Sequence, residues 1–142
     1  MAWHVPGKPN LETVKRNMRH PFVFKAEKSV EAILYIAQNV KQPTFHSISK
    51  MMYFADKVHL EKYGRFICGD NYVAMKHGPV PSGTYDILKV ARGDGFAPLS
   101  ALTLVKQAFT VIDKFLVEPL RAVSMGFRVF GQCHQGIRTL TI

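Results

Sequence analysis

Residues 72–86 read YVAMKHGPVPSGTYD, and this stretch decides much of the local fold. It begins with a short apolar run that is typical of a strand. Pro79 and Pro81 then remove backbone N–H donors and favour an extended conformation rather than a helix. Ser82 follows in a position to cap a helix over residues 83–91. The stretch therefore predicts a strand, a rigid turn and the start of a helix.

Two clearer helices precede this stretch. Apolar residues recur every three or four positions over residues 27–40 and 45–64, a spacing that predicts amphipathic helices. Thr44 or Ser47 is expected to cap the second helix by accepting a backbone N–H bond. Gly64 is expected to end it, because glycine tolerates the left-handed backbone found at many helix ends.

Two short hairpins are predicted beside the helices. Residues 65–76 are interpreted as two strands around the turn-rich Gly-Asp-Asn at 69–71, and residues 108–120 as a hairpin turning at positions 113–114. Residues 99–107 fit either a helix or a strand. The predicted fold class is α+β and mainly helical, a single compact domain with a helical core and two short β-hairpins.

The composition suits one globular domain and leaves two interpretations of its charge. The chain has 142 residues, of which 47% are hydrophobic and 20% charged, so it can form a real core. The formal charge is +9, which makes polyanions eligible partners. The basic residues are spread along the chain and are locally dense only over residues 14–28. A solvated basic surface is the plainer interpretation, and a nucleic-acid face is the other.

The cysteine spacing and the apolar runs of the sequence bear on the cellular compartment of the protein and on its metal content. Cys68 and Cys133 form no CxxC pair, so neither a disulfide framework nor a zinc site is predicted. The first ten residues carry no apolar core of the signal-peptide type, and no apolar run is long enough to span a bilayer. We therefore predict a cytoplasmic protein without metal, cofactor or membrane contact.

No catalytic motif accompanies the histidines and carboxylates. Asp56 and His59 are three positions apart on a predicted helix and can touch, but an exposed pair is the plainer interpretation because no nucleophile motif accompanies them. His77 lies in none of the common metal motifs. The two prolines that follow it remove donors that a phosphate loop would need. An enzyme is not predicted.

A dense set of positions resembles the Panacea domain, also called the SocA-like antitoxin domain. The first half of the match is Lys50, Tyr53, Phe54, Ala55, Asp56, His59, Leu60, Tyr63 and Gly64. The second half is Gly69, Asp70, Tyr72, Ala74, Met75, Lys76, Gly78, Pro79, Val80, Pro81, Ser82, Tyr85 and Asp86. The upstream helix and the FLVEPLR segment (115–121) are also similar, so the resemblance covers about residues 22–121.

The resemblance implies a function rather than a catalytic site. It implies a bacterial or phage-encoded antitoxin that neutralises a cognate toxin protein by direct binding. One branch of the family acts as a proteolytic adaptor, which makes a cellular protease a second expected partner. The family provides no catalytic residues that can be transferred to this chain.

Seven polar or aromatic residues are expected to converge near the proline-rich turn, as partner-binding or platform residues. They are Tyr53, Asp56, His59, Asp70, Tyr72, His77 and Tyr85. The turn itself is assigned to Gly78, Pro79, Pro81 and Ser82.

The flanks of this domain are predicted to differ from it. Residues 1–21 are interpreted as a partly irregular N-terminal extension with a short basic helix near residues 10–20. Residues 122–142 depart from the family, which usually continues into an acidic segment and a final helix. This tail contains no acidic residue. We interpret it as divergent, or as the product of a shifted reading frame, and expect it to be poorly ordered.

A DNA-binding regulator is the alternative function. Two helices followed by a hairpin loosely resemble a winged helix, and the charge favours phosphate contacts. The second helix, however, carries lysines mixed with acids and lacks Arg, Asn or Gln in its middle to read bases. Nucleic acid is therefore a secondary expectation.

Overall fold

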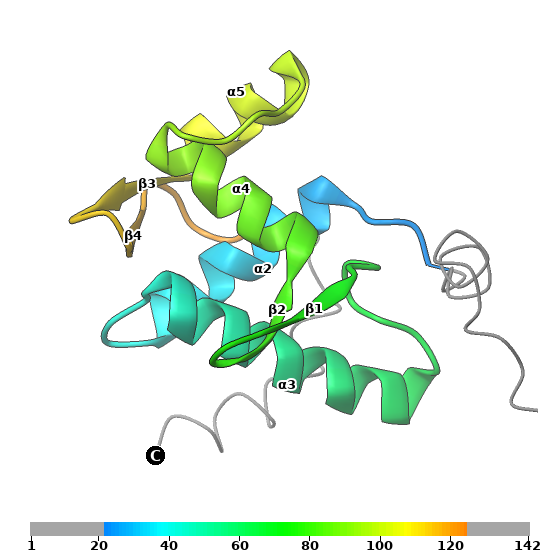
Figure 1. The fold of residues 1–142 in the computed structure, drawn as a ribbon. Helices are drawn as coiled ribbons and strands as arrows, with labels where there is room; N and C mark the ends of the chain where they lie inside the picture. Colours follow the sequence, from blue (N-terminus) through cyan, green and yellow to red (C-terminus); the bar gives the residue numbers. More distant parts are fainter. Residues whose placement is uncertain (1–21, 125–142) are drawn as a thin grey trace, which may run out of the picture.

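The computed structural model describes residues 22–124, and they form a mainly helical α+β fold with two short antiparallel hairpins. The predicted fold class is thus confirmed. In Figure 1, α2 lies between the other helices, with α3 on one side and α4 and α5 on the other. The predicted helix near residues 10–20 and most of the tail lie outside the described residues.

Helix α2 (Ala26–Asn39) is the central element of the core. Its apolar residues repeat at helical spacing, but burial extends almost around the helix because α3, α4, α5 and β4 all contact it. Ile33 and Leu34 are fully buried, and the smaller Ala32 allows close packing on another side. The hydroxyls of Ser29 and Thr84 share a hydrogen bond of 2.9 Å inside this core, which joins α2 to α4. The helix predicted over residues 27–40 is confirmed.

Helix α3 (Phe45–Tyr63) begins and ends as the sequence predicts. The Ser47 amide donates to the Thr44 hydroxyl oxygen at 3.1 Å, and the Thr44 amide donates to the Ser47 hydroxyl oxygen at 2.9 Å. This reciprocal capping box satisfies two amides that the helix itself leaves unpaired. Gly64 ends the helix with φ of +67°. Ile48 and Met52 are the buried anchors of its inner face.

The first hairpin is not where the sequence analysis placed it. Strand β1 (Tyr72–Met75) pairs with β2 (Gly78–Pro81) around a turn at positions 76 and 77, so the turn predicted at residues 69–71 is wrong. Gly69 has φ of +70°, and a Cβ there would collide with the Val23 carbonyl. The glycine therefore permits a close backbone approach rather than a hairpin turn. The prolines fit β2 because a two-stranded sheet leaves one side of each strand outside the ladder.

Helix α4 (Ser82–Arg92) follows β2 directly, and helix α5 (Leu99–Ala108) follows after a short loop. Residues 99–107, which fitted either a helix or a strand, are thus helical. Leu88 of α4 and Val105 of α5 are buried in the core.

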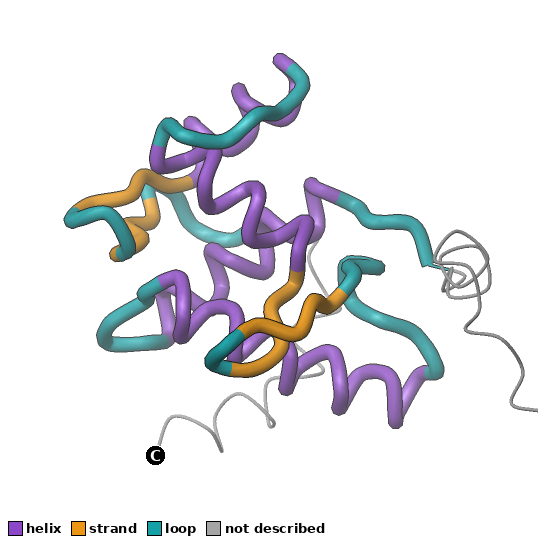
Figure 2. Tube along the Cα trace, viewed as in Figure 1, coloured by secondary structure: helices purple, strands orange, loops and turns teal. Residues whose placement is uncertain are grey.

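The second hairpin is confirmed as predicted. Strand β3 (Phe109–Ile112) pairs with β4 (Leu116–Pro119), and Asp113 and Lys114 in the turn have φ of +50° and +67°. The Phe45 amide donates to the Phe115 carbonyl at 2.9 Å, which fixes this turn against the start of α3. Figure 2 shows the two hairpins in orange at different places around the helices.

The last described residues return to α2. The Arg121 guanidinium and the amide and hydroxyl of Ser124 all donate to the Glu31 carboxylate. No helix among residues 22–124 is both long and apolar enough to cross a membrane.

Candidate functional site

Asp56 attaches the first hairpin to the middle of α3. Its side chain is buried and accepts hydrogen bonds from the Ile67 amide at 2.7 Å and from the Tyr72 hydroxyl at 2.6 Å. Burial raises the pKa of the Asp56 carboxyl above its usual range, and the two hydrogen bonds only partly oppose this. Burial and the neighbouring Asp56 carboxylate likewise raise the pKa of Tyr72. The hairpin is therefore held by a desolvated polar contact rather than by backbone pairing with another sheet.

Asp70 holds the start of α4. Its carboxylate accepts from the amides of Asn71, Gly83 and Thr84 and from the Thr84 hydroxyl, at 2.7 to 2.8 Å. Ser82, predicted to cap this helix, makes no capping hydrogen bond with its side chain. The prediction is wrong because a buried carboxylate from the preceding loop already satisfies the first amides of the helix.

His59 is part of the interior and not an exposed partner of Asp56. Its Nδ1 lies 2.6 Å from the Arg65 carbonyl oxygen, and its ring packs 4.7 Å from the Tyr63 ring centroid. His59 and Asp56 are 2% and 1% exposed, so the predicted exposed pair is wrong. The hydrogen bonds described for both residues go to the segment that follows α3, and they hold that segment back along the helix.

Tyr53 lies beside the contact between Asp56 and Tyr72. Its ring centroid is 5.5 Å from that of Tyr72, in an edge-to-face arrangement. A shallow pocket of about 320 Å³ opens here, lined by Tyr53, Asp56, Lys57, Leu60, Phe66 and Tyr72. Tyr53, Asp56 and Tyr72 are thus brought together.

His77 and Tyr85 lie elsewhere, in a groove of about 250 Å³ between the start of α3, the first hairpin and α4. We call it the hairpin groove. It is lined by Phe45, His46, Ser49, Lys50, Met75, Lys76, His77, Gly78, Val80, Tyr85 and Phe115. The seven residues expected at one turn therefore divide, with Tyr53, Asp56 and Tyr72 in the shallow pocket, His77 and Tyr85 in the groove, and His59 and Asp70 buried.

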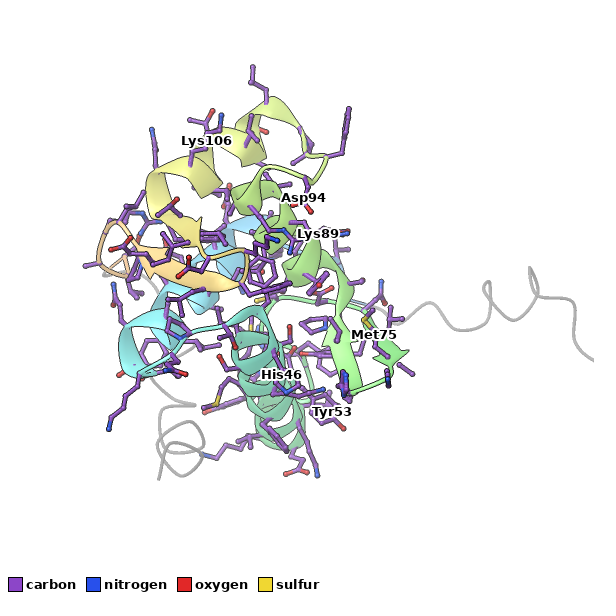
Figure 3. All side chains as sticks on the ribbon, turned by 60° about the vertical axis from the view of Figure 1, so that its left-hand side comes forward. His46, Tyr53, Met75, Lys89, Asp94 and Lys106 are labelled. Atoms are coloured by element: carbon purple, nitrogen blue, oxygen red, sulfur yellow. The ribbon has the colours of Figure 1, made fainter. Side chains whose placement is uncertain are left out.

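The hairpin groove has an apolar floor and a basic rim. Phe45, Val80 and Phe115 contribute apolar surface, while Lys50 and Lys76 bring charge. The Lys50 ammonium donates to the Pro79 carbonyl at 3.2 Å, which fixes the lysine against β2. Figure 3 shows His46 on α3 and Met75 on the hairpin beside it.

Two histidines face each other across the rim. The ring centroids of His46 and His77 are 6.4 Å apart, with the rings nearly perpendicular. Both residues are exposed. The sequence analysis selected His77 and missed His46, because His46 stands at the start of a helix with no motif around it.

Three aromatic residues of the groove lining, Phe45, Tyr85 and Phe115, pack against one another, and we call them the aromatic wall. The Phe45 ring lies 5.7 Å from Phe115 and 5.9 Å from Tyr85, both edge to face. The Arg92 guanidinium lies 5.2 Å from the Phe45 centroid and 5.3 Å from the Phe115 centroid. Such cation–π contacts favour a fixed arrangement of the rings. Phe115 was not predicted as a site residue, since its approach depends on how the second hairpin docks.

Two observations concern the metal-binding and nucleophilic side chains of the described residues. Among residues 22–124, no three His, Cys, Asp or Glu side chains gather closely enough to hold a metal ion. Burial raises the pKa of the Cys68 thiol well above its usual range, and this opposes formation of the reactive thiolate. The described residues thus form a small α+β fold with a groove beside its first hairpin.

The comparison with protein families found a similar family. Residues 48–114 match the family model described as "Antitoxin SocA-like, Panacea domain". The resemblance stated from the sequence is confirmed over these residues. The match supports an antitoxin role in general, with a toxin as the partner, and the family is not typically enzymatic. Comparisons with the curated proteins and with the solved structures found no match.

Proposed function

We propose that this protein neutralises a toxin by binding it directly through the surface formed by α3, the first hairpin and the start of α4. The observation that carries the proposal is the hairpin groove, whose lining residues come mainly from the matched Panacea segment. The proposed domain spans residues 22–121. The seven residues selected from the sequence are its partner-binding or platform residues.

Exposed apolar side chains on the groove and on the two elements that border it, β1 and α3, support protein binding. Val73 and Met75 on β1 are 49% and 54% exposed, and Phe115 is 50% exposed. Phe54 on α3 is 42% exposed. Large apolar residues that gather on one surface commonly mark a protein interaction site. Their burial against a partner would supply the hydrophobic part of the binding free energy.

Rigidity of the surface also supports the proposal. Asp56 and Asp70 hold the hairpin and α4 by buried hydrogen bonds, so the groove is already formed before a partner arrives. A preorganised surface loses less conformational entropy on binding than a flexible loop does.

Co-expression tests the proposal. The gene beside this one is expressed alone and then together with the present chain, while growth and complex formation are measured. We expect the neighbouring product to arrest growth alone, and the full chain to restore growth and to co-purify with it. The proposal fails if no adjacent gene is toxic, or if the chain never restores growth.

An adaptor role would add a protease to the complex. It rests on the family resemblance, and it predicts that the toxin disappears faster when the present chain is co-expressed. A pulse-chase measurement of toxin half-life distinguishes delivery to a protease from simple sequestration, which would leave the half-life unchanged or longer.

DNA binding is a second candidate because of the charge of +9. Residues 22–124 contain thirteen Lys or Arg and nine Asp or Glu, a net charge of +4, so over half of the excess lies in the flanks. The apolar groove floor favours a protein ligand over a phosphate backbone. A gel shift with no DNA binding at low salt would eliminate this candidate.

A further inference from the structure

We infer that the hairpin groove receives a single large apolar side chain from an acidic segment of the partner toxin. This inference rests on the proposed function and specifies the chemistry of the partner at that site. It follows from the size of the groove, from the nature of its floor and from the charge of its rim.

The groove has the size of a side-chain pocket. At about 250 Å³ it is smaller than the cavities of roughly 300–1,000 Å³ that hold cofactors and drug-sized ligands. Its floor is built from the rings of Phe45 and Phe115 with Val80 and Met75 beside them. A floor of this kind is complementary to a Phe, Leu, Met or Trp side chain, which would be desolvated on entry.

The rim selects the charge around that side chain. Lys50 and Lys76 line the groove together with His46 and His77, and no Asp or Glu of the described part of the chain belongs to the lining. Arg92 lies against the rings of Phe45 and Phe115, but its charge is paired with the Asp94 carboxylate at 2.6 Å, so the positive charge of the rim comes from the two lysines. Carboxylates that flank the apolar anchor would meet this rim favourably, whereas lysines or arginines there would be repelled.

A second apolar groove provides an internal comparison. It lies between Phe24, α4 and α5 and has a volume of about 310 Å³. Among residues 22–124, its lining includes Asp86 and the fully exposed Phe96 but no Lys or Arg. Its charge therefore does not favour an acidic segment. If acidic peptides bind to the hairpin groove and not to this second groove, the charge of the rim, and not apolar area alone, determines which groove they bind.

Short synthetic peptides are the probe for this inference. Each carries one Phe, Leu or Trp, set among Asp and Glu residues in one series, neutral residues in a second and Lys residues in a third. Binding to the isotope-labelled full chain is followed by NMR chemical-shift changes. We expect the acidic series to bind best, with shifts at Met75, His77 and Phe115. Raising the salt from about 0.05 M to about 0.5 M should weaken binding, since exposed charges are screened.

Charge reversal on the rim provides the matched variant. Lys76→Glu should weaken binding of the acidic peptides at least about threefold, as expected for loss and reversal of an exposed ion pair. Lys106→Glu makes the same change in net charge on α5, at the other end of the view in Figure 3 from the groove residues His46 and Met75, and should leave the affinity unchanged. Both side chains are exposed, so neither change is expected to unfold the chain.

Three results would overturn the inference. The first is that the three peptide series bind equally well, or that none of them binds. The second is that the chemical-shift changes centre on Phe96 rather than on the hairpin groove. The third is that a short oligonucleotide binds the groove more tightly and displaces the peptides. The co-expression experiment is independent of these. If the toxin is neutralised but the peptides show no acidic preference, the proposed function stands and the groove assignment fails. If the peptides bind as expected but no toxin is neutralised, the proposed function fails instead.

Discussion

The Tyr72 hydroxyl donates a 2.6 Å hydrogen bond to the Asp56 carboxylate, and this contact joins the first hairpin to α3 across sixteen positions of sequence. Within residues 22–124, this sheet consists of β1 and β2 alone, so no third strand pairs with the hairpin. The Asp56–Tyr72 contact is thus the buried polar link between α3 and the hairpin, beside the more exposed Lys50–Pro79 hydrogen bond, and it helps to set the shape of the hairpin groove.

Replacing Tyr72 with Phe should destabilise the protein by about 1–2 kcal/mol. The variant keeps the ring and its packing against Tyr53, but it leaves one oxygen of a buried carboxylate without its donor. The free energy of unfolding in urea measures the effect. Tyr63→Phe, at a tyrosine that is 43% exposed, is the control and should change stability by less than about 0.5 kcal/mol. Equal effects of the two substitutions would contradict this role for the Tyr72 hydroxyl.

Asp56 should give the protein a characteristic pH dependence. Burial raises the pKa of its carboxyl in the folded state above the ordinary value of 3.8. The folded state therefore holds this proton more tightly than the unfolded state does. The contribution of Asp56 to stability is greatest below the ordinary pKa and is lost as the pH rises through the raised pKa of the folded state.

Asp56→Asn isolates this dependence, because the amide does not titrate. The stability of the wild-type protein relative to the variant should increase as the pH is lowered from about 7 toward about 4. Urea unfolding at several pH values measures the difference between the two proteins. A difference that stays constant, or that changes in the opposite direction, would show that the Asp56 pKa is not raised.

Substitutions of Asp70 and of Ser82 should differ in their effect on stability, although both residues lie at the start of α4. Asp70→Ala removes the acceptor of four hydrogen bonds and leaves the buried Thr84 amide without a partner, so it should cost about 3 kcal/mol. Ser82→Ala should cost less than about 0.5 kcal/mol, because its side chain does not cap the helix. Urea unfolding of both variants shows which residue caps the helix. A larger loss of unfolding free energy in Ser82→Ala would mean that Ser82, and not Asp70, is the cap.

The turn of the second hairpin offers a stabilising change. Lys114 has φ of +67°, a left-handed conformation that is costly for a residue with a Cβ. Lys114→Gly should therefore stabilise the protein by about 0.5–1 kcal/mol, and thermal unfolding measures the shift. Lys106→Gly, inside α5, is the matched control and should destabilise by about 1 kcal/mol. A loss of stability in both variants would show that Lys114 is not strained.

Helical elements were predicted well because their determinants are local. The Thr44 and Ser47 capping box, Gly64 at the helix end and the apolar spacing of α2 all act within a few residues, so a single sequence carries them. The second hairpin belongs with these, since its turn lies between two apolar runs of similar length.

The errors arose where contacts are distant in sequence. Gly69 and Asp70 have the composition of a turn, but Gly69 permits the approach of Val23, and Asp70 caps a helix twelve or more positions away. The hairpin groove was only half predicted for the same reason. His77 and Tyr85 belong to one conspicuous stretch, whereas His46 and Phe115 reach the groove from a helix start and from a separate hairpin.

His77→Ala separates the scaffold of the groove from its partner contacts. The imidazole is exposed at the turn of the first hairpin and lies 6.4 Å from the His46 ring, so its removal should change unfolding free energy by less than about 0.5 kcal/mol. If His77 contacts the toxin, the variant should bind it about fivefold or more weakly, as for a typical contributing interface residue. Isothermal titration with purified toxin measures the affinity, and growth on co-expression measures neutralisation. Lys106→Ala is the control for loss of an exposed basic side chain outside the groove. Unchanged affinity and neutralisation in His77→Ala would place the toxin contact away from this rim.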